Sequence, residues 1–166
     1  VEGCEFSPFH FLVAEYNGQP VACVSSWIEN LDGVSSWMAR SALMQHYYPK
    51  DALDYVQKLK HITDKMMVHR TDGAMQIESV FVSVEHRGKG LAAKLIKAHV
   101  AKFLLQQYPV SHAELMTYIE NKTAIHAYEK MGFSINERTE CDDPDVLTYF
   151  PVAGMLLMQT DIMNLM

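Results

Sequence analysis

The sequence predicts a fold that mixes α and β structure, α/β or α+β, on three observations. A β-hairpin pattern lies near the N-terminus, a strand followed by a glycine-bearing loop and a long amphipathic helix lies in the middle, and a second strand and helix follow. The chain has 166 residues, of which 49% are hydrophobic and 20% are charged. This length and composition suit one domain over residues 1–166 with one core.

The N-terminal third predicts a hairpin and then helices. Residues 9–28 form two β-rich runs on either side of Asn17-Gly18, a pair of residues typical of tight hairpin turns. Residues 35–67 are rich in helix-forming side chains, and Pro49 predicts a break that divides them into two helices.

The middle of the chain predicts a strand, a loop and a helix. Residues 75–84 alternate in the manner of a strand, with Glu78, Val80, Val82 and Val84 on one face. After the loop, apolar residues recur at helical spacing from Leu91 to Leu104.

The last third predicts further strands around a short helix. A strand is expected over residues 113–119, and a short helix over residues 121–130 with Asn121 as N-cap and Gly132 as the stop. A β run from Phe133, an acidic loop around Asp142 and a last apolar run over residues 152–159 complete the order.

Composition argues against several classes of function. Lys and Arg number 14 against 20 Asp and Glu, which gives a net charge of −6 and makes nucleic acid a poor partner. No apolar run reaches the ~20 residues that span a bilayer, so a membrane role is not expected. The histidines and three cysteines lack metal-ligand spacing, so no metal is predicted. Cys4, Cys23 and Cys141 suit reduced thiols, and a cytoplasmic location is expected.

The loop Arg87-Gly88-Lys89-Gly90-Leu91-Ala92 is suited to binding an anion. It lies between a strand and a helix, where small residues let backbone N–H groups approach a phosphate at the positive end of the helix. It is neither the dinucleotide fingerprint nor the P-loop. The alternative is a tight turn whose glycines serve backbone geometry.

Two motifs resemble the GNAT superfamily of acyl-CoA-dependent N-acyltransferases. Its cofactor motif is Gln or Arg, two residues, Gly, any residue, then Gly or Ala, which Arg87, Gly90 and Ala92 match. Asn121-x-x-Ala124-x-x-x-Tyr128, followed by Gly132-Phe133, is similar to the second cofactor motif. The resemblance covers about Gln76 to Phe133, and the hairpin resembles the family's second and third strands. The usual first strand and helix have no counterpart before it.

The resemblance implies a mixed, mostly antiparallel central sheet flanked by helices, with a strand-loop-helix site for acetyl-CoA. In this family the strand that holds Val82 and Val84 pairs with the pantetheine arm, and the amides of residues 87–92 bind the pyrophosphate. Arg87 and Lys89 then add only surface charge. Asn121 contacts the cofactor arm by resemblance, while its role as a helix cap is equally compatible with the sequence.

Two residues are candidates for the chemistry of acyl transfer. An amine near pKa ~10 must lose a proton before it attacks a thioester. Glu78 is the candidate base, because many members of the family carry an acidic residue there; its alternative is a carboxylate at the end of a strand, paired with a basic residue on the surface. Tyr128 matches the family's proton donor to the departing thiolate; its alternative is a packed aromatic side chain.

The predicted function is therefore transfer of an acetyl or other short acyl group from acetyl-CoA to an amine by direct attack. The acceptor is a small molecule or a protein, and a homodimer is possible by resemblance. Residues 37–48 and the loop near Asp142 are expected to carry acceptor specificity. The alternatives are a catalytically silent acyl-CoA-binding domain and, more remotely, an unrelated nucleotide-binding domain.

Overall fold

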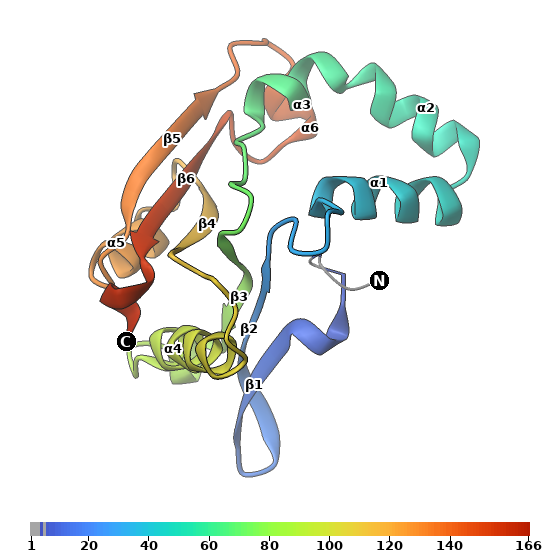
Figure 1. Cartoon of the computed structure of the whole chain (residues 1–166). Helices are drawn as coiled ribbons and strands as arrows, with labels where there is room; N and C mark the ends of the chain where they lie inside the picture. The colour runs from blue at the N-terminus through green and yellow to red at the C-terminus, as the bar shows by residue number, and fades with distance from the viewer. Residues whose placement is uncertain (1–3, 5) are drawn as a thin grey trace.

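A computed structural model describes residue 4 and residues 6–166 of the chain (Figure 1). The strands are β1 (Phe11–Tyr16), β2 (Gln19–Ile28), β3 (Met75–Val82), β4 (His112–Tyr118), β5 (Ser134–Glu140) and β6 (Gly154–Asp161). The α-helices are α1 (Ser36–Tyr47), α2 (Lys50–Lys58), α3 (Lys60–Met66), α4 (Leu91–Leu105), α5 (Lys122–Glu129) and α6 (Val146–Tyr149). Short 3-10 helices are η1 (Pro8–His10), η2 (Val84–His86) and η3 (Ile162–Leu165).

The six strands form one sheet in the order β1-β2-β3-β4-β6-β5. Every neighbouring pair is antiparallel except β3 and β4, which run parallel. The predicted mixed and mostly antiparallel sheet is confirmed. Because the chain crosses from β3 to β4 through α4, the glycine-bearing loop lies at the end of a central strand of the sheet.

The predicted hairpin is confirmed at its turn. Asn17 and Gly18 have φ angles of 52° and 74°, the left-handed conformation that a two-residue hairpin turn requires. Tyr16 pairs with Gln19 directly across it.

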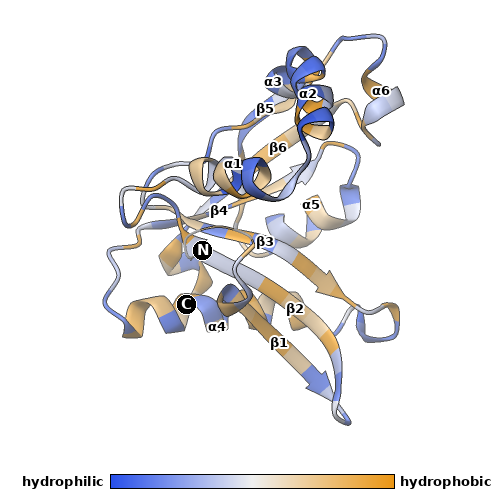
Figure 2. Ribbon diagram, turned by 90° about the vertical axis from the view of Figure 1, so that its right-hand side faces the viewer, coloured by the Kyte–Doolittle hydropathy of each residue, from blue (hydrophilic) through white to orange (hydrophobic). Residues whose placement is uncertain are grey.

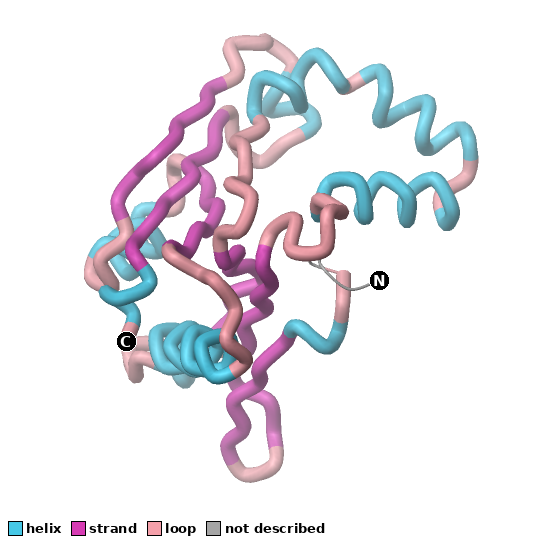
Figure 3. Tube along the Cα trace, in the orientation of Figure 1, coloured by secondary structure: helices cyan, strands magenta, loops and turns pink. Residues whose placement is uncertain are grey.

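The segment between β2 and β3 contains three helices where the sequence predicted two. The predicted break occurs at Pro49, and a second break at Leu59 separates α2 from α3. Figures 1 and 3 show α1 and α2 projecting from the sheet as an arm. Figure 2 shows that α2 and α3 carry mostly hydrophilic residues, whereas apolar residues gather on β1, β2 and β3.

The predicted strand over residues 75–84 is two residues too long. β3 ends at Val82, and Val84 begins the 3-10 helix η2, where its side chain is 68% exposed. Because Val84 lies outside the strand, it cannot pair with a ligand in the way the sequence predicted.

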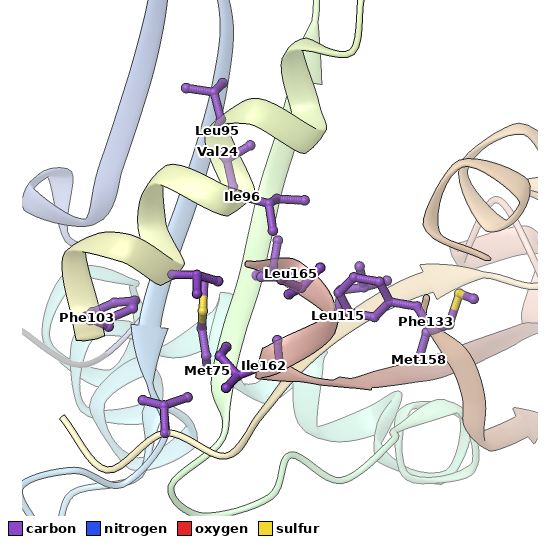
Figure 4. Packing of buried hydrophobic residues seen from close by; sticks show 14 of the residues in the cluster. Val24, Met75, Leu95, Ile96, Phe103, Leu115, Phe133, Met158, Ile162 and Leu165 are labelled. Atoms are coloured by element: carbon purple, nitrogen blue, oxygen red, sulfur yellow. The ribbon is translucent and has the colours of Figure 1, made fainter. Parts of the chain in front are cut away.

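The main core lies between the sheet and α4, which contacts β1, β2 and β3 (Figure 4). Figure 4 shows Val24 close to Leu95 and Ile96 of α4. A second, smaller core joins α3 to the segment between β5 and β6, and its buried members are Ile62, Met66, Cys141, Val146 and Val152.

None of the helices formed by residue 4 and residues 6–166 is both long and apolar enough to cross a membrane.

Candidate functional site

Strands β3 and β4 separate soon after they meet. They pair only at Met75 with Ala113, Gln76 with Glu114, and Ile77 with Leu115. The other edge of β3 continues to pair with β2 as far as Val82. The backbone of residues 78–82 therefore has an edge that pairs with no strand in the described part of the chain.

A β-bulge lies where the two strands separate. Ser79 has a φ of 52°, and the register of β3 with β2 shifts between the pairs Glu78–Ser25 and Phe81–Cys23. The extra residue reverses the alternation of side chains. Ile77 and Val80 consequently both contact the main core, although they are three residues apart.

The bulge corrects the predicted faces of this strand. The sequence placed Glu78 on the same face as Val80 and Val82. In the structure Val80 and Val82 pack against the core, whereas the Glu78 carboxylate pairs with Arg70, which is not part of that core. Strict alternation fails here because it assumes one residue per partner across the ladder.

A cavity of 310 Å³ occupies the space between the separated strands. Its walls include three residues that the sequence singled out, Glu78, Asn121 and Tyr128. The remaining lining residues are Ile77, Ser79, Val80, Met116, Thr117, Tyr118 and Met155. Residues from two separate motifs therefore meet around one cavity.

Tyr128 reaches this cavity from α5. Its ring packs edge-on against Phe133 with the ring centroids 6.0 Å apart, and it contacts the main core. Burial raises the pKa of the Tyr128 phenol above its ordinary value of 10.0. The phenol is therefore protonated at neutral pH and able to donate a proton in the cavity.

Asn121 caps α5. Its Oδ1 accepts a hydrogen bond from the Ala124 N–H at 3.3 Å, and the same side chain lines the cavity. The helix-cap role is confirmed, and the position at the cavity leaves room for the second role that the sequence suggested.

The glycine-bearing loop joins η2 to the N-terminus of α4. Gly88 and Gly90 have φ angles of 75° and 71°, and no atom lies within 4 Å of where a Cβ would stand on either. The first hydrogen bond of α4 runs from Lys94 N–H to the Gly90 carbonyl at 3.0 Å. The N–H groups of residues 91–93 precede that bond at the positive end of a 15-residue helix.

Arg87 does more than add surface charge. Its Nε donates a hydrogen bond to the Val82 carbonyl at 3.1 Å, which ties the loop to the end of β3.

Arg70 is the ion-pair partner of Glu78. The two side chains form an ion pair in which Arg70 is 9% exposed and Glu78 is 24% exposed. The Arg70 guanidinium also stacks over the Trp27 ring, 5.0 Å from its centroid, and donates to Ser36 Oγ at 2.5 Å. Both of the roles suggested for Glu78 therefore remain compatible with its position, since an ion-paired carboxylate also lines the cavity.

A second cavity of 510 Å³ lies on the Arg70 side. Met116 and Met155 belong to the walls of both cavities, so the two spaces adjoin. Its other lining residues are Glu29, Ser35, Ser36, Trp37, Arg40, Met67, Val68, His69, Arg70 and Asp72.

Sequence reasoning located this second cavity only in part. Trp37 and Arg40 belong to the segment 37–48 that was expected to carry specificity. Asp142 lies outside both cavities and pairs with Lys65 of α3. Arg70 was missed, because it is one basic residue beside a turn and nothing local marks its contact with Glu78.

No group of three or more His, Cys, Asp or Glu side chains suited to a metal ion occurs among the residues that the structure describes.

Three solved structures resemble the chain in fold. Naa20 from Chaetomium thermophilum in complex with a bisubstrate analogue has a TM-score of 0.59 at 17% identity, with 96% of this chain and 69% of that chain covered. The ribosomal-protein-S18-alanine N-acetyltransferase from Escherichia coli has a TM-score of 0.54 at 14% identity, with 94% and 72% covered. The putative acetyltransferase yncA from Salmonella typhimurium, with its cofactor acetyl-CoA, has a TM-score of 0.52 at 16% identity, with 92% and 64% covered.

No curated protein matches the chain by sequence. A family model described as the acetyltransferase (GNAT) family matches residues 2–133, which is most of the chain and includes β3, the loop, β4 and α5. Members of this family use acetyl-CoA. The match and the shared fold lead to one conclusion: the chain belongs to the GNAT family of acetyltransferases.

Proposed function

We propose that the protein is an N-acetyltransferase that moves the acetyl group of acetyl-CoA onto an amine by direct attack. The observation that carries the proposal is the 310 Å³ cavity between the separated strands, which has Glu78 and Tyr128 in its walls. An acid and a base at one cavity, beside an unpaired strand edge, are the groups that this transfer requires.

The residues present fit acetyl-CoA. The unpaired edge of residues 78–82 offers backbone groups to the amides of the pantetheine arm, as an added strand would. The space beside Gly88 and Gly90 and the N-terminus of α4 suit a pyrophosphate, which needs several N–H donors. Val82 is the last residue of β3 and remains a candidate to pair with the pantetheine arm. Val84 lies beyond the end of the strand, in η2.

The proposed chemistry needs no covalent enzyme intermediate. The amine nitrogen bonds to the thioester carbonyl carbon, and the bond between carbon and sulfur breaks. The proton lost by the amine passes to Glu78, directly or through water, and the departing thiolate takes a proton from Tyr128. The backbone N–H groups of the strand edge stabilise the charge on the carbonyl oxygen.

The second cavity supports a class of acceptor. Its walls carry apolar side chains, Trp37, Met67, Val68, Met116 and Met155, and it adjoins the cavity that holds Glu78. We therefore propose that the acceptor is an amine attached to an apolar group, with the nitrogen directed toward Glu78 and the apolar group held between α1 and residues 67–72.

The test is to titrate the protein with acetyl-CoA by calorimetry and then to follow thiol release with a panel of amines. The panel pairs each apolar amine with a polar amine of similar size. Binding followed by release with the apolar amines is the expected result. Binding with no release from any amine would favour the silent acyl-CoA-binding alternative, and absence of binding would overturn the proposal.

A variant of Glu78 needs a matched control because of Arg70. Glu78→Gln removes the base but also leaves a nearly buried guanidinium without its carboxylate, which destabilises the fold by itself. Arg70→Met removes the ion pair and keeps the carboxylate. A base role predicts that Glu78→Gln depresses turnover most at low pH, where the amine is most protonated, and that Arg70→Met does not. A purely structural pair predicts similar losses in both variants.

A further inference from the structure

His99 is a buried residue of α4 that the proposed chemistry does not use. It is 1% exposed and lies parallel to Phe103 with ring centroids 6.2 Å apart. Its Nε2 lies 3.0 Å from the backbone carbonyl oxygen of Val24 in β2. Because a carbonyl can only accept a hydrogen bond, the proton of the neutral ring is on Nε2.

The charge state of the ring agrees with this hydrogen bond. Burial, opposed by the bond to Val24, lowers the pKa of His99 below its ordinary value of 6.5, and Lys102 and His10 add to the lowering. Nδ1 has no hydrogen-bond partner among the residues that the structure describes. The ring is therefore neutral near pH 7 and makes one hydrogen bond, to Val24.

Val24 lies directly opposite the bulge. Its neighbours Cys23 and Ser25 are paired with Phe81 and Glu78, and Val24 itself has no register partner on β3. The hydrogen bond from His99 thus reaches the one residue of β2 at which the ladder with β3 is interrupted.

Two side chains of β2 bind the backbone of β3 at the bulge. Ser25 Oγ donates to the Glu78 carbonyl at 3.1 Å, and Cys23 Sγ donates to the Ser79 carbonyl at 3.7 Å. The carbonyls of the last paired residue before the bulge and of Ser79 are thus bound by side chains of β2. A non-glycine residue at positive φ persists only where its surroundings hold it.

We propose that His99 is a positioning residue that maintains the bulge at Ser79 and thereby the separation of β3 from β4. It acts through Val24, because its ring contacts neither cavity. A regular ladder at this point would restore strict alternation and put Glu78 on the same face of β3 as Val80 and Val82. The functional consequence rests on the proposed function, whereas the effect on the bulge does not.

The test compares His99→Phe, which keeps a flat ring, with His99→Gln, whose Nε2 can still donate to the carbonyl. His99→Phe is expected to change the amide chemical shifts and to speed hydrogen exchange at Ser79 and Val80 in the free protein. It is also expected to weaken acetyl-CoA binding about tenfold, the effect of one lost buried hydrogen bond. His99→Gln is expected to restore most of both signals.

Val100→Ala is the matched control, since Val100 is the next residue of α4 and is 1% exposed in the same core. It loosens the packing without removing the hydrogen bond. Bulge amides that stay as in the parent protein in His99→Phe, or that change equally in Val100→Ala, would overturn the inference. If the parent protein fails to bind acetyl-CoA, the proposed function fails, and the amide comparison still decides the role of His99.

A measurement on the parent protein covers the case in which His99→Phe does not fold. Nitrogen chemical shifts of the ring at pH 7 are expected to show the neutral form with its proton on Nε2. A proton on Nδ1, or on both nitrogens, would contradict the bond to Val24 and the inference with it.

Discussion

Tyr128 illustrates how one side chain comes to line the cavity between β3 and β4. The short helix α5 begins at a cap made by Asn121, which fixes where the helix starts. Seven residues later Tyr128 packs against Phe133 and lines the cavity. Packing and chemistry coexist here, because the ring can be buried while the hydroxyl lines a space. The two readings of Tyr128 left by the sequence are therefore not exclusive.

We predict that Tyr128→Phe slows turnover about a hundredfold, at the lower end of what a general acid contributes, without weakening acetyl-CoA binding. Because the pKa of the phenol is raised, the proton remains available below pH 10, and the variant should lose activity evenly from pH 6 to pH 9. Steady-state rates and calorimetry measure the two effects. Tyr118→Phe, in the wall of the same cavity, is the control and should stay active. Equal rates for Tyr128→Phe and the parent would leave Tyr128 a packing role alone.

At the scale of elements, the strand, loop and helix from β3 to α4 act as one unit. β3 supplies an unpaired edge, Arg87 ties the loop to the end of the strand, and Gly88 and Gly90 allow the backbone to turn in the left-handed region. The helix then begins with free N–H groups aimed at the same loop. In the site that we propose for the pyrophosphate, the donors are therefore an arrangement of backbone groups and not any single side chain.

We predict that Gly90→Glu weakens acetyl-CoA binding by at least about tenfold, because a carboxylate at the helix N-terminus occupies and repels the place of the pyrophosphate. Gly90→Asn, which tolerates a positive φ and adds no charge, should bind nearly as the parent does. Calorimetry measures both.

Gly18→Glu controls for backbone strain, since Gly18 has a similar φ of 74° at the hairpin turn with no atom near its Cβ position. Loss of binding in this variant as well would attribute the effect to stability and remove the loop assignment.

At the scale of the whole molecule, the two hydrophobic cores support different regions. The main core supports the β3–α4 unit, and the second core anchors α3 to the segment between β5 and β6. The arm of α1 and α2 connects the two regions, and the start of α1 forms a wall of the 510 Å³ cavity. Stability of the second core should therefore affect the acceptor side of the molecule more than the side proposed for acetyl-CoA.

We predict that Ile62→Val, at a fully buried position of the second core, lowers the free energy of unfolding by about 0.5–1.5 kcal/mol. It should raise KM for the amine and leave the Kd for acetyl-CoA unchanged. Ile96→Val, fully buried in the main core beneath the sheet, is the matched substitution and should affect acetyl-CoA binding. An acetyl-CoA Kd that rises equally in both variants would mean that the two regions are not separable.

The sequence by itself determined the features that depend on neighbouring residues. Asn17-Gly18 predicted the hairpin turn, and Asn121 predicted the N-cap of α5. The spacing from Arg87 to Ala92 predicted a loop before a helix. These features could be predicted because turns, caps and glycine conformations depend on neighbouring residues. The motif residues Glu78 and Tyr128 could also be named, although 50 residues apart, through their resemblance to a family.

Only the tertiary structure decided which groups meet and which way they face. The bulge at Ser79 reverses a side-chain alternation that looks regular in sequence, and its partners Val24 and His99 come from other elements. The pairing of Arg70 with Glu78, and the second cavity, arise because β3 packs beside a segment that follows the helical arm. Such contacts depend on register and on how segments pack against one another, so local periodicity does not predict them.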